Sequence, residues 1–348
     1  MVESVGTHFP TSWQYGPEEL HIFKSTISQV NNKFPNNRNL IINTTWFGSQ
    51  FNNNEWQKAL SFSGNFDNLF LLSVIDPLYL TDVDLDILIK KYNFKKIYRI
   101  GMFENSDYEW NFHAIVGKDL MPKYKEDVVI LDTPPEYIFM LYQRKPRAHR
   151  VEITNLLRNE DLLKHGIVTL GDKSTLNWHQ DMEFTPIYID DSADNYKHNG
   201  SKKDFGGIPN DLVTVGRLDL WKNHFLNIVS ETVFDEWEPL LITEKIWKAM
   251  IGLRPFIVHG NPKTYGWLRK NGFRTFNDYW KHIPVETVKE GFGPHDAVLR
   301  TIKFLSDFSK EDLLDMYNAM LPNLRYNKER FYEFSEEQTR KMGNIFSN

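Results

Sequence analysis

The chain has 348 residues, a formal net charge of −5 and no cysteine. This length is enough for two domains, or for one large domain with a sizeable core. The absence of cysteine excludes disulfides and thiolate chemistry and suits a reducing compartment, so we expect a cytoplasmic protein. The negative charge gives no general attraction to nucleic acid or anionic lipid, and no segment approaches the roughly 18 apolar residues that a membrane span needs.

Short β-rich runs alternate with a helical pattern in the first third of the chain. The runs NLIINTTWF, NLFLLSVID and KKIYRIGMF are rich in β-branched and aromatic residues and predict strands over 39–47, 68–76 and 95–103. Between the last two, residues 81–94 show a helical pattern that ends in basic residues. A succession of strand, helix and strand predicts parallel pairing and an α/β architecture.

A second set of elements begins at residue 128, with the segment VVILDTPPEYIFMLYQ. A helical pattern starts at Arg150, and the polar segment 190–210 is expected to be a surface excursion. The last 50 residues are mostly helical in pattern, and Ser309 is suited to cap one of these helices. A further strand is expected in YIFMLYQ (137–143), and the segments GIVTLGD and HFLNIVSET stand before and after the polar segment.

No internal repeat or low-complexity segment divides the chain, so the expected boundary rests on the order of the elements. We place it near residue 140. The expected organisation is an N-terminal domain over 1–140, a C-terminal domain over 141–330 and a helical tail over 331–348.

The segment LLITEKIWKAMIGLRPFIVHG, residues 240–260, places a polar Thr-Glu-Lys between two apolar runs. Thr243 is suited to be the N-cap of a helix, which Gly252 would end and the strand RPFIVHG would follow. The buried stripe of this helix would consist of Ile246, Trp247, Met250 and Ile251.

Glu244 and Lys245 would then occupy the first turn of the helix. The free N–H groups and partial positive charge of a helix N-terminus, together with the full charge of a lysine, suit a diphosphate. The carboxylate of Glu244 can accept hydrogen bonds from two ribose hydroxyls. An ordinary capped helix with no ligand is the alternative.

The predicted strand over 95–103 is followed by Glu104. Ligands of open α/β sheets bind at the carboxyl ends of parallel strands, so a carboxylate there can act as general base on a sugar hydroxyl. A polar turn made of Glu104, Asn105 and Ser106 is the other interpretation, and residue chemistry alone favours neither.

The basic segment QRKPRAHR, residues 143–150, leads from a predicted strand into a predicted helix. Arg150 at its end is therefore a candidate phosphate ligand. A solvated basic loop and a contact with a nucleic-acid backbone are the alternatives.

Metal sites are only weakly indicated. The sequence DVDLD, residues 82–86, has the Asp-x-Asp spacing that can hold a divalent ion on a diphosphate. It lies inside a predicted helix, where residues two apart do not share a face, so a solvated helix face is favoured. The histidines lack the spacing of a zinc site. We expect no metal site, although a divalent ion remains compatible with the pattern.

Three segments, taken in this order, resemble the α1,3-fucosyltransferases and their viral and bacterial relatives. The segment GMFENSDYEWNFHAI is similar to the one that carries the general base of that family, which implies this role for Glu104. The segment KPRAHRVEITNLL is similar to the loop and helix that carry the donor-phosphate arginine, which implies this role for Arg150.

The third segment, residues 227–262, is similar to the nucleotide-binding block of the family. The resemblance implies that Glu244 binds the ribose and Lys245 the β-phosphate, with Glu231 and Thr243 in the same site. The sequence departs from the family where Val-Ser-Glu-Thr stands in place of Phe-x-Glu-Asn-Ser. Leu241 also stands where the family has an aromatic residue, so contacts with the base and sugar can differ.

The resemblance implies an α/β fold with two Rossmann-like domains facing a cleft, the B architecture of glycosyltransferases. It implies a soluble inverting enzyme that transfers a fucose-like sugar from a nucleotide-diphosphate sugar, expected to be GDP-linked, to a hydroxyl of a glycan acceptor. No cofactor is required beyond the nucleotide-sugar donor. The expected location is the cytoplasm, or the host cytoplasm if the source is a virus.

Two other functions stay open. One is a phage-type DNA glycosyltransferase that modifies hydroxymethylated bases from a UDP-sugar, for which the basic segment 143–150 would contact the backbone of the DNA. The negative net charge speaks against it. The other is a non-catalytic module that binds a nucleotide sugar without turning it over.

Overall fold

The structure is a computed structural model of the chain. The chain divides into two compact units: unit 1 is Met1–Val116 with Ser335–Asn348, and unit 2 is Gly117–Phe334. The structure describes residues 17–43, 66–73, 82–101, 106–117, 130–143, 145–171, 183–187, 218–236, 240–280, 283–286 and 292–346.

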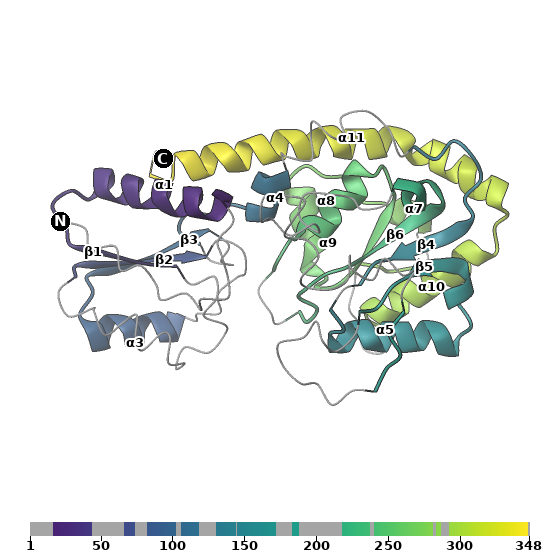
Figure 1. Ribbon diagram of the computed structural model, residues 1–348, viewed down its shortest axis with the longest axis horizontal. Coiled ribbons are helices and arrows are strands. Elements are labelled where there is room, and N and C mark those ends of the chain that lie inside the picture. The colour runs from purple at the N-terminus through teal and green to yellow at the C-terminus, as the bar shows by residue number, and fades with distance from the viewer. Residues whose placement is uncertain are drawn as a thin grey trace. The chain divides into compact units, whose positions relative to one another are not determined.

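Unit 1 is built on a parallel sheet with the strand order β1-β2-β3. Helix α1 lies on one face of the sheet and α3 on the other (Figure 1). Because both faces are covered, every residue of β2 is buried, as is usual for parallel strands. The elements are α1 (Pro17–Lys33), β1 (Asn39–Asn43), β2 (Asn68–Ser73), α3 (Asp82–Tyr92), β3 (Lys96–Gly101) and α4 (Phe112–Gly117).

The alternation of side chains along the strands of unit 1 creates two packed layers. One layer faces α3 and contains Leu40, Ile42, Leu69, Leu71, Leu88 and Phe94. On the other face the rings of Phe70 and Tyr98 stack with their centroids 4.6 Å apart. Phe34, between α1 and β1, packs against both rings, and Phe346 near the C-terminus packs against Phe70.

Unit 2 is built on a parallel sheet with the strand order β5-β4-β6-β7. The chain moves outward from β4 to β5 on one side and from β6 to β7 on the other, so the strand order reverses between β4 and β6. The strands are β4 (Tyr137–Leu141), β5 (Gly166–Val168), β6 (His224–Ser230) and β7 (Phe256–His259).

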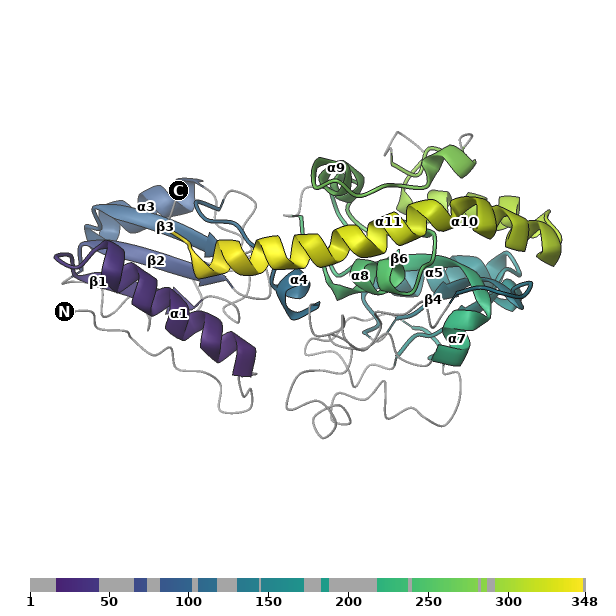
Figure 2. The ribbon, with the colours of Figure 1, turned by 90° about the horizontal axis from the view of Figure 1, so that it is seen from above.

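Helices cover both faces of this second sheet. Helices α5 and α10 lie on one face and α8 on the other, with α11 running over α8 (Figures 1 and 2). The contact between α8 and α11 is aromatic, since the ring of Trp247 stacks on Phe331 at 5.1 Å. The helical elements are α5 (Ala148–Asn159), η3 (Leu163–His165), α7 (Leu218–Lys222), α8 (Glu244–Ile251), α9 (Lys263–Lys270), η6 (Asn277–Trp280), α10 (Pro294–Ser306) and α11 (Lys310–Gly343).

The end of α8 shows why the sequence has glycine there. Gly252 is the C-cap of α8, as predicted, but its φ is an ordinary −74°. The left-handed residue is Leu253, with φ 50°. A side chain at Gly252 would lie 2.3 Å from the indole of Trp221, so glycine is needed at this position for close packing.

The α/β prediction with parallel strands is confirmed, whereas the predicted boundaries need correction. The expected boundary between residues 140 and 141 falls within β4, inside unit 2. The expected tail over 331–348 begins inside α11, a helix that Ser309 caps as predicted. Helix α5 begins at Ala148, two residues before Arg150. Among the described residues, no helix is both long and apolar enough to cross a membrane.

Candidate functional site

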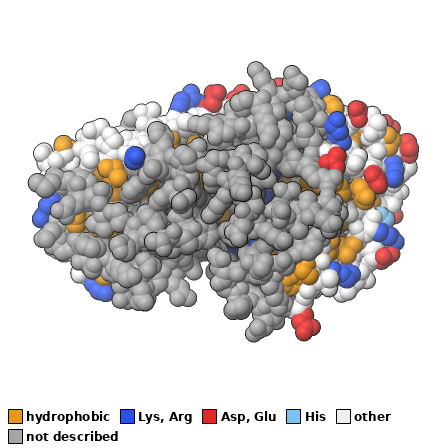
Figure 3. Space-filling view, viewed as in Figure 1, with side chains coloured by type: hydrophobic (Ala, Val, Ile, Leu, Met, Phe, Trp, Pro, Cys, Tyr) orange, Lys and Arg blue, Asp and Glu red, His pale blue; other side chains and the backbone are white. Residues whose placement is uncertain are grey.

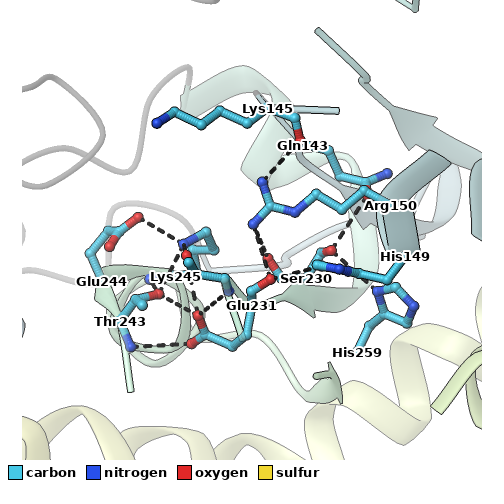
Figure 4. Close-up of polar contacts among 11 residues, drawn as sticks. Gln143, Lys145, His149, Arg150, Ser230, Glu231, Thr243, Glu244, Lys245 and His259 are labelled. Carbon is cyan, nitrogen blue, oxygen red and sulfur yellow. Dashed lines mark hydrogen bonds and ion pairs between the residues drawn. The ribbon is translucent and has the colours of Figure 1, made fainter. Parts of the chain in front are cut away.

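The strand-order reversal in unit 2 marks the place where a ligand would bind. In open α/β sheets, the ligand lies outside the carboxyl ends of the strands at such a reversal. Here the carboxyl ends of β4 and β6 lie side by side, and the chain continues from them into Gln143 and Glu231. Helices α5 and α8 both begin close to this edge, and Figure 4 shows the polar side chains that gather there. Figure 3 shows the surface of the same molecule coloured by side-chain type.

Arg150, in the first turn of α5, links the two strand ends (Figure 4). Its Nη1 donates to the carbonyl of Lys145 at 3.2 Å, and its Nη2 donates to the carbonyls of Ser230 and Glu231 at 3.0 Å each. The residue is only 4% exposed. The solvated-loop interpretation is therefore wrong for Arg150, which instead holds the loop after β4 against the end of β6.

His149 supports the same peptide from the side. Its Nε2 lies 3.1 Å from the carbonyl oxygen of Glu231, and its ring stacks on Phe234 at 4.8 Å. Burial, and next the charge of Arg150, lower the pKa of His149 to about 2. The ring is thus neutral at physiological pH, with its proton on Nε2, because a carbonyl can only accept.

Glu231 anchors the N-terminus of α8. The residue is 1% exposed, and its carboxylate accepts hydrogen bonds from the backbone N–H groups of Thr243 at 3.2 Å and Thr232 at 3.3 Å. The hydroxyl of Thr243 also donates to it. Thr243 is the N-cap of α8, as predicted, and its Oγ1 accepts from the N–H of Lys245 at 3.4 Å. A buried negative charge at this place stabilises the positive end of the helix dipole.

Lys245 lies between two carboxylates. Its Nζ is 3.7 Å from Glu231 and 3.2 Å from Glu244, and it donates to the hydroxyls of Thr243 at 3.0 Å and Thr232 at 3.3 Å. A cation in the first turn of a helix is unfavourable by itself, and these two carboxylates offset the cost. The Lys245 side chain is 24% exposed and that of Glu244 8%, so Lys245 is the more accessible of the two.

The structure thus gathers Arg150, Glu231, Thr243, Glu244 and Lys245 at one edge of one sheet. Glu104, the predicted general base, lies outside the described residues. The Asp-x-Asp sequence lies in α3, where Asp86 is exposed, in agreement with a solvated helix face. The described part of the chain contains no group of three or more His, Asp or Glu side chains placed to hold a metal ion.

Sequence reasoning missed a second set of polar residues beneath this cluster. Gln143, Ser230 and His259 each follow or end an apolar strand of the same parallel sheet, and each is buried. Their position directly after apolar strands could have identified them in the sequence, because the carboxyl ends of neighbouring parallel strands meet at one edge of the sheet.

Comparisons with protein families, with curated proteins and with solved structures find no match to this chain. The function is therefore inferred from the chemistry of the residues and from their placement.

Proposed function

We propose that this protein is an inverting glycosyltransferase of the B architecture. It would transfer a sugar, fucose-like by resemblance, from a nucleotide-diphosphate sugar to a hydroxyl of a glycan. The observation that carries the proposal is the convergence of Lys245, the capped N-terminus of α8 and the buried Arg150 on the strand-order reversal of unit 2. Cations and helix N–H groups at such a place suit a diphosphate.

The proposed donor site assigns a different task to each side chain. Lys245 turns from Glu231 and Glu244 toward the β-phosphate, beside the free N–H groups of the first turn of α8. Glu244, released from the ion pair, accepts hydrogen bonds from the ribose hydroxyls. Arg150 contributes a fixed positive charge and keeps the two strand ends in place, while Glu231 and Thr243 hold the helix terminus rigid.

In the proposed reaction, an acceptor hydroxyl attacks the anomeric carbon from the face opposite the nucleotide. Glu104 takes the proton of that hydroxyl as general base. The bond from the anomeric carbon to the phosphate oxygen breaks, and the sugar is transferred with inversion. Lys245, Arg150 and the helix N–H groups stabilise the negative charge that develops on the leaving nucleoside diphosphate, so the proposal requires no metal ion.

The nucleotide site is tested by calorimetry with GDP, UDP, CMP and dTDP sugars. We expect Lys245→Ala to weaken binding of the preferred donor by about tenfold to a hundredfold, because a charge-assisted hydrogen bond contributes about 1.5–3 kcal/mol. Lys248→Ala is the matched control, since it removes the same charge from a partly exposed position one turn later in α8. Equal affinities in the two variants would contradict the site.

The chemistry is tested separately with Glu104→Gln. This variant should lose transfer while it keeps the donor affinity of the wild type. Retained transfer would remove Glu104 from the role of base. The acceptor assay should include glycans and DNA with hydroxymethylated bases, and transfer to the DNA alone would replace the glycan acceptor with a base. Donor binding without transfer to either acceptor would point to a non-catalytic module.

A further inference from the structure

A chain of polar contacts runs from the candidate site to the surface of unit 2. Ser230 Oγ lies 3.2 Å from Nδ1 of His259, and Nε2 of His259 lies 3.3 Å from Nδ1 of His295. Nε2 of His295 lies 3.3 Å from the carboxylate of Glu152, which is an ion-pair distance without the alignment of a hydrogen bond. The chain begins at a fully buried strand end, of which Figure 4 shows Ser230 and His259, and finishes at a carboxylate that is 64% exposed.

In the neutral state, one arrangement of protons satisfies each contact in turn. The negative charge of the Glu152 carboxylate favours a proton on Nε2 of His295, the nitrogen that faces it. Nδ1 of His295 then accepts from Nε2–H of His259, whose Nδ1 in turn accepts from the hydroxyl of Ser230. Both imidazoles remain uncharged.

A second arrangement becomes available when His295 gains a proton from solvent. Both of its nitrogens then donate, and Nε2 of His259 becomes the acceptor. His259 stays neutral with its proton on Nδ1, which donates to Oγ of Ser230. The hydroxyl of Ser230 must then find another acceptor, and Oε1 of Gln143 lies 3.4 Å away. The net change is one proton gained, and a hydroxyl has moved its hydrogen bond from β7 to the loop after β4.

The change of hydrogen-bond acceptor by Ser230 affects the ends of both β6 and β4, the two strands that flank the strand-order reversal. The carbonyl of Ser230 accepts from Arg150, and Gln143 is fixed by Thr154 at 3.0 Å and Thr169 at 2.9 Å. When the hydroxyl of Ser230 donates to Gln143 rather than to His259, this 3.4 Å contact joins the ends of β6 and β4 directly, as Arg150 does.

We propose that His259 and His295 are positioning residues for the nucleotide-sugar site, which they connect to the exposed carboxylate of Glu152. This inference rests on the proposed function. Protonation of His295 adds a positive charge to unit 2 and a second link across the strand-order reversal, and both favour an anionic ligand. The affinity for the donor should therefore rise as the pH falls.

The groups around His295 determine where it titrates. Burial lowers its pKa, and the carboxylates of Glu152 and Asp296 act in the opposite direction. His259 and His149 face it as neutral rings, and the charge of Arg150 acts on both of them. Burial outweighs the carboxylates, so the neutral arrangement prevails at neutral pH, and the protonated one gains population only at a pH below the usual pKa of histidine.

We call the coupled change of protonation at His295, His259 and Ser230 the relay. It is tested on the ligand-free protein by nitrogen NMR of the imidazole rings. As the pH falls, His295 should become protonated on both nitrogens, and His259 should move its proton from Nε2 to Nδ1 with the same midpoint. In Glu152→Gln that midpoint should fall by about 0.5–1 pH unit, because an opposite charge that favoured the cation is lost. Glu160→Gln, at the C-cap of α5 and paired with Lys303, is the control and should leave it unchanged.

Independent midpoints for the two rings, a fixed tautomer of His259, or an unchanged midpoint in Glu152→Gln would overturn the relay. The coupling is tested by calorimetry with a nucleotide-diphosphate sugar, which lacks the terminal phosphate proton of a free nucleotide that titrates near pH 6. Its affinity should rise toward low pH with the midpoint seen by NMR, shifted in the same way in Glu152→Gln. An affinity without this dependence overturns the positioning role, whereas a chain that binds no nucleotide sugar overturns the proposed function itself.

Discussion

Gly101 ends β3 in a backbone conformation that other residues rarely adopt. Its φ is 99°, and an added Cβ would lie 2.1 Å from the carbonyl oxygen of Ser73 on the neighbouring strand. We expect Gly101→Ala to destabilise unit 1 by about 2–4 kcal/mol, because backbone strain adds to a clash with backbone that cannot move aside. Urea denaturation monitored by tryptophan fluorescence, to which the nearby Trp110 contributes, measures the loss.

Gly266→Ala is the comparison for this variant. Gly266 lies inside α9, and an added Cβ there would meet no atom within 4 Å. Alanine is favoured over glycine in helices by about 0.5–1 kcal/mol, so this variant should be slightly stabilised. Equal effects of the two substitutions would show that Gly101 is not conformationally required.

At the level of single residues, the sequence predicts local roles better than tertiary ones. Thr243 was recognisable as a cap because its partner, the N–H of Lys245, lies two residues away. The contacts of Arg150 with Ser230 and Glu231 join residues about 80 positions apart, and no local pattern encodes them. The basic segment 143–150 therefore left a solvated loop open as an alternative, where the structure has a buried arginine.

At the level of the element, the stability of α8 depends on how its first turn is held. Thr243→Val keeps the shape of the side chain but removes the hydroxyl that accepts from Lys245 N–H and donates to the carboxylate of Glu231. We expect a loss of about 1–3 kcal/mol in the free energy of unfolding, the sum of a lost cap and a weakened buried carboxylate. Chemical denaturation measures it.

Thr243→Ser is the matched variant, because it retains the hydroxyl. It should stay within about 0.5 kcal/mol of the wild type, since serine and threonine cap helices almost equally well. If Thr243→Ser were as unstable as Thr243→Val, the methyl group rather than the cap would account for the loss.

The elements themselves were largely predictable. β1 and β2 begin at Asn39 and Asn68, where the predicted strands begin, because apolar runs on a sheet covered on both faces differ clearly from their polar flanks. The start of α5 was missed by two residues, since His149 and Arg150 are polar side chains buried by tertiary contacts and do not look like a helix interior. Periodicity shows which residues are apolar, and it does not show which polar residues are buried.

At the scale of the whole molecule, buried neutral histidines make the fold sensitive to acid. Burial lowers the pKa of His149 to about 2 and those of His224 and His259 well below the usual value. Below about pH 6.5 these histidines are protonated in the unfolded chain but not in the folded chain. The free energy of unfolding therefore decreases as the pH is lowered. We expect a loss of about 1.4 kcal/mol per histidine between pH 7.5 and 5.5, measured by urea denaturation across that range.

His224→Asn isolates one of these contributions. The asparagine amide can donate to the carbonyl of Leu220 as Nδ1 of His224 does, and it does not titrate. In this variant the loss of unfolding free energy between pH 7.5 and 5.5 should be smaller by the contribution of one histidine, about 1.4 kcal/mol. His165→Asn, at a partly exposed position in η3, should leave the dependence unchanged. The opposite pattern would show that burial of His224 is not the cause.

The division into two units was the least predictable property of the chain. The order of elements placed a boundary near residue 140, yet β4 belongs wholly to unit 2, because its partners β5 and β6 follow it in the sequence. Both units have the same α/β pattern, so the amino-acid composition does not change at the boundary between them. Only the pairing of the strands shows to which unit an element belongs.

Unit 1 is formed by two segments that are far apart in the sequence, so its parts are synthesised at different times. Residues 335–346 complete this unit: Ser335 bonds to the carbonyl of Ala114 at 2.6 Å, Gln338 accepts from the N–H of Asn111 at 2.9 Å, and Phe346 packs on Tyr108. Residues 1–116 leave the ribosome exit tunnel well before residues 335–346 are synthesised. Of the two units, the one that is synthesised first is thus completed last, and we expect its strands to be prone to misassembly until α11 has been synthesised.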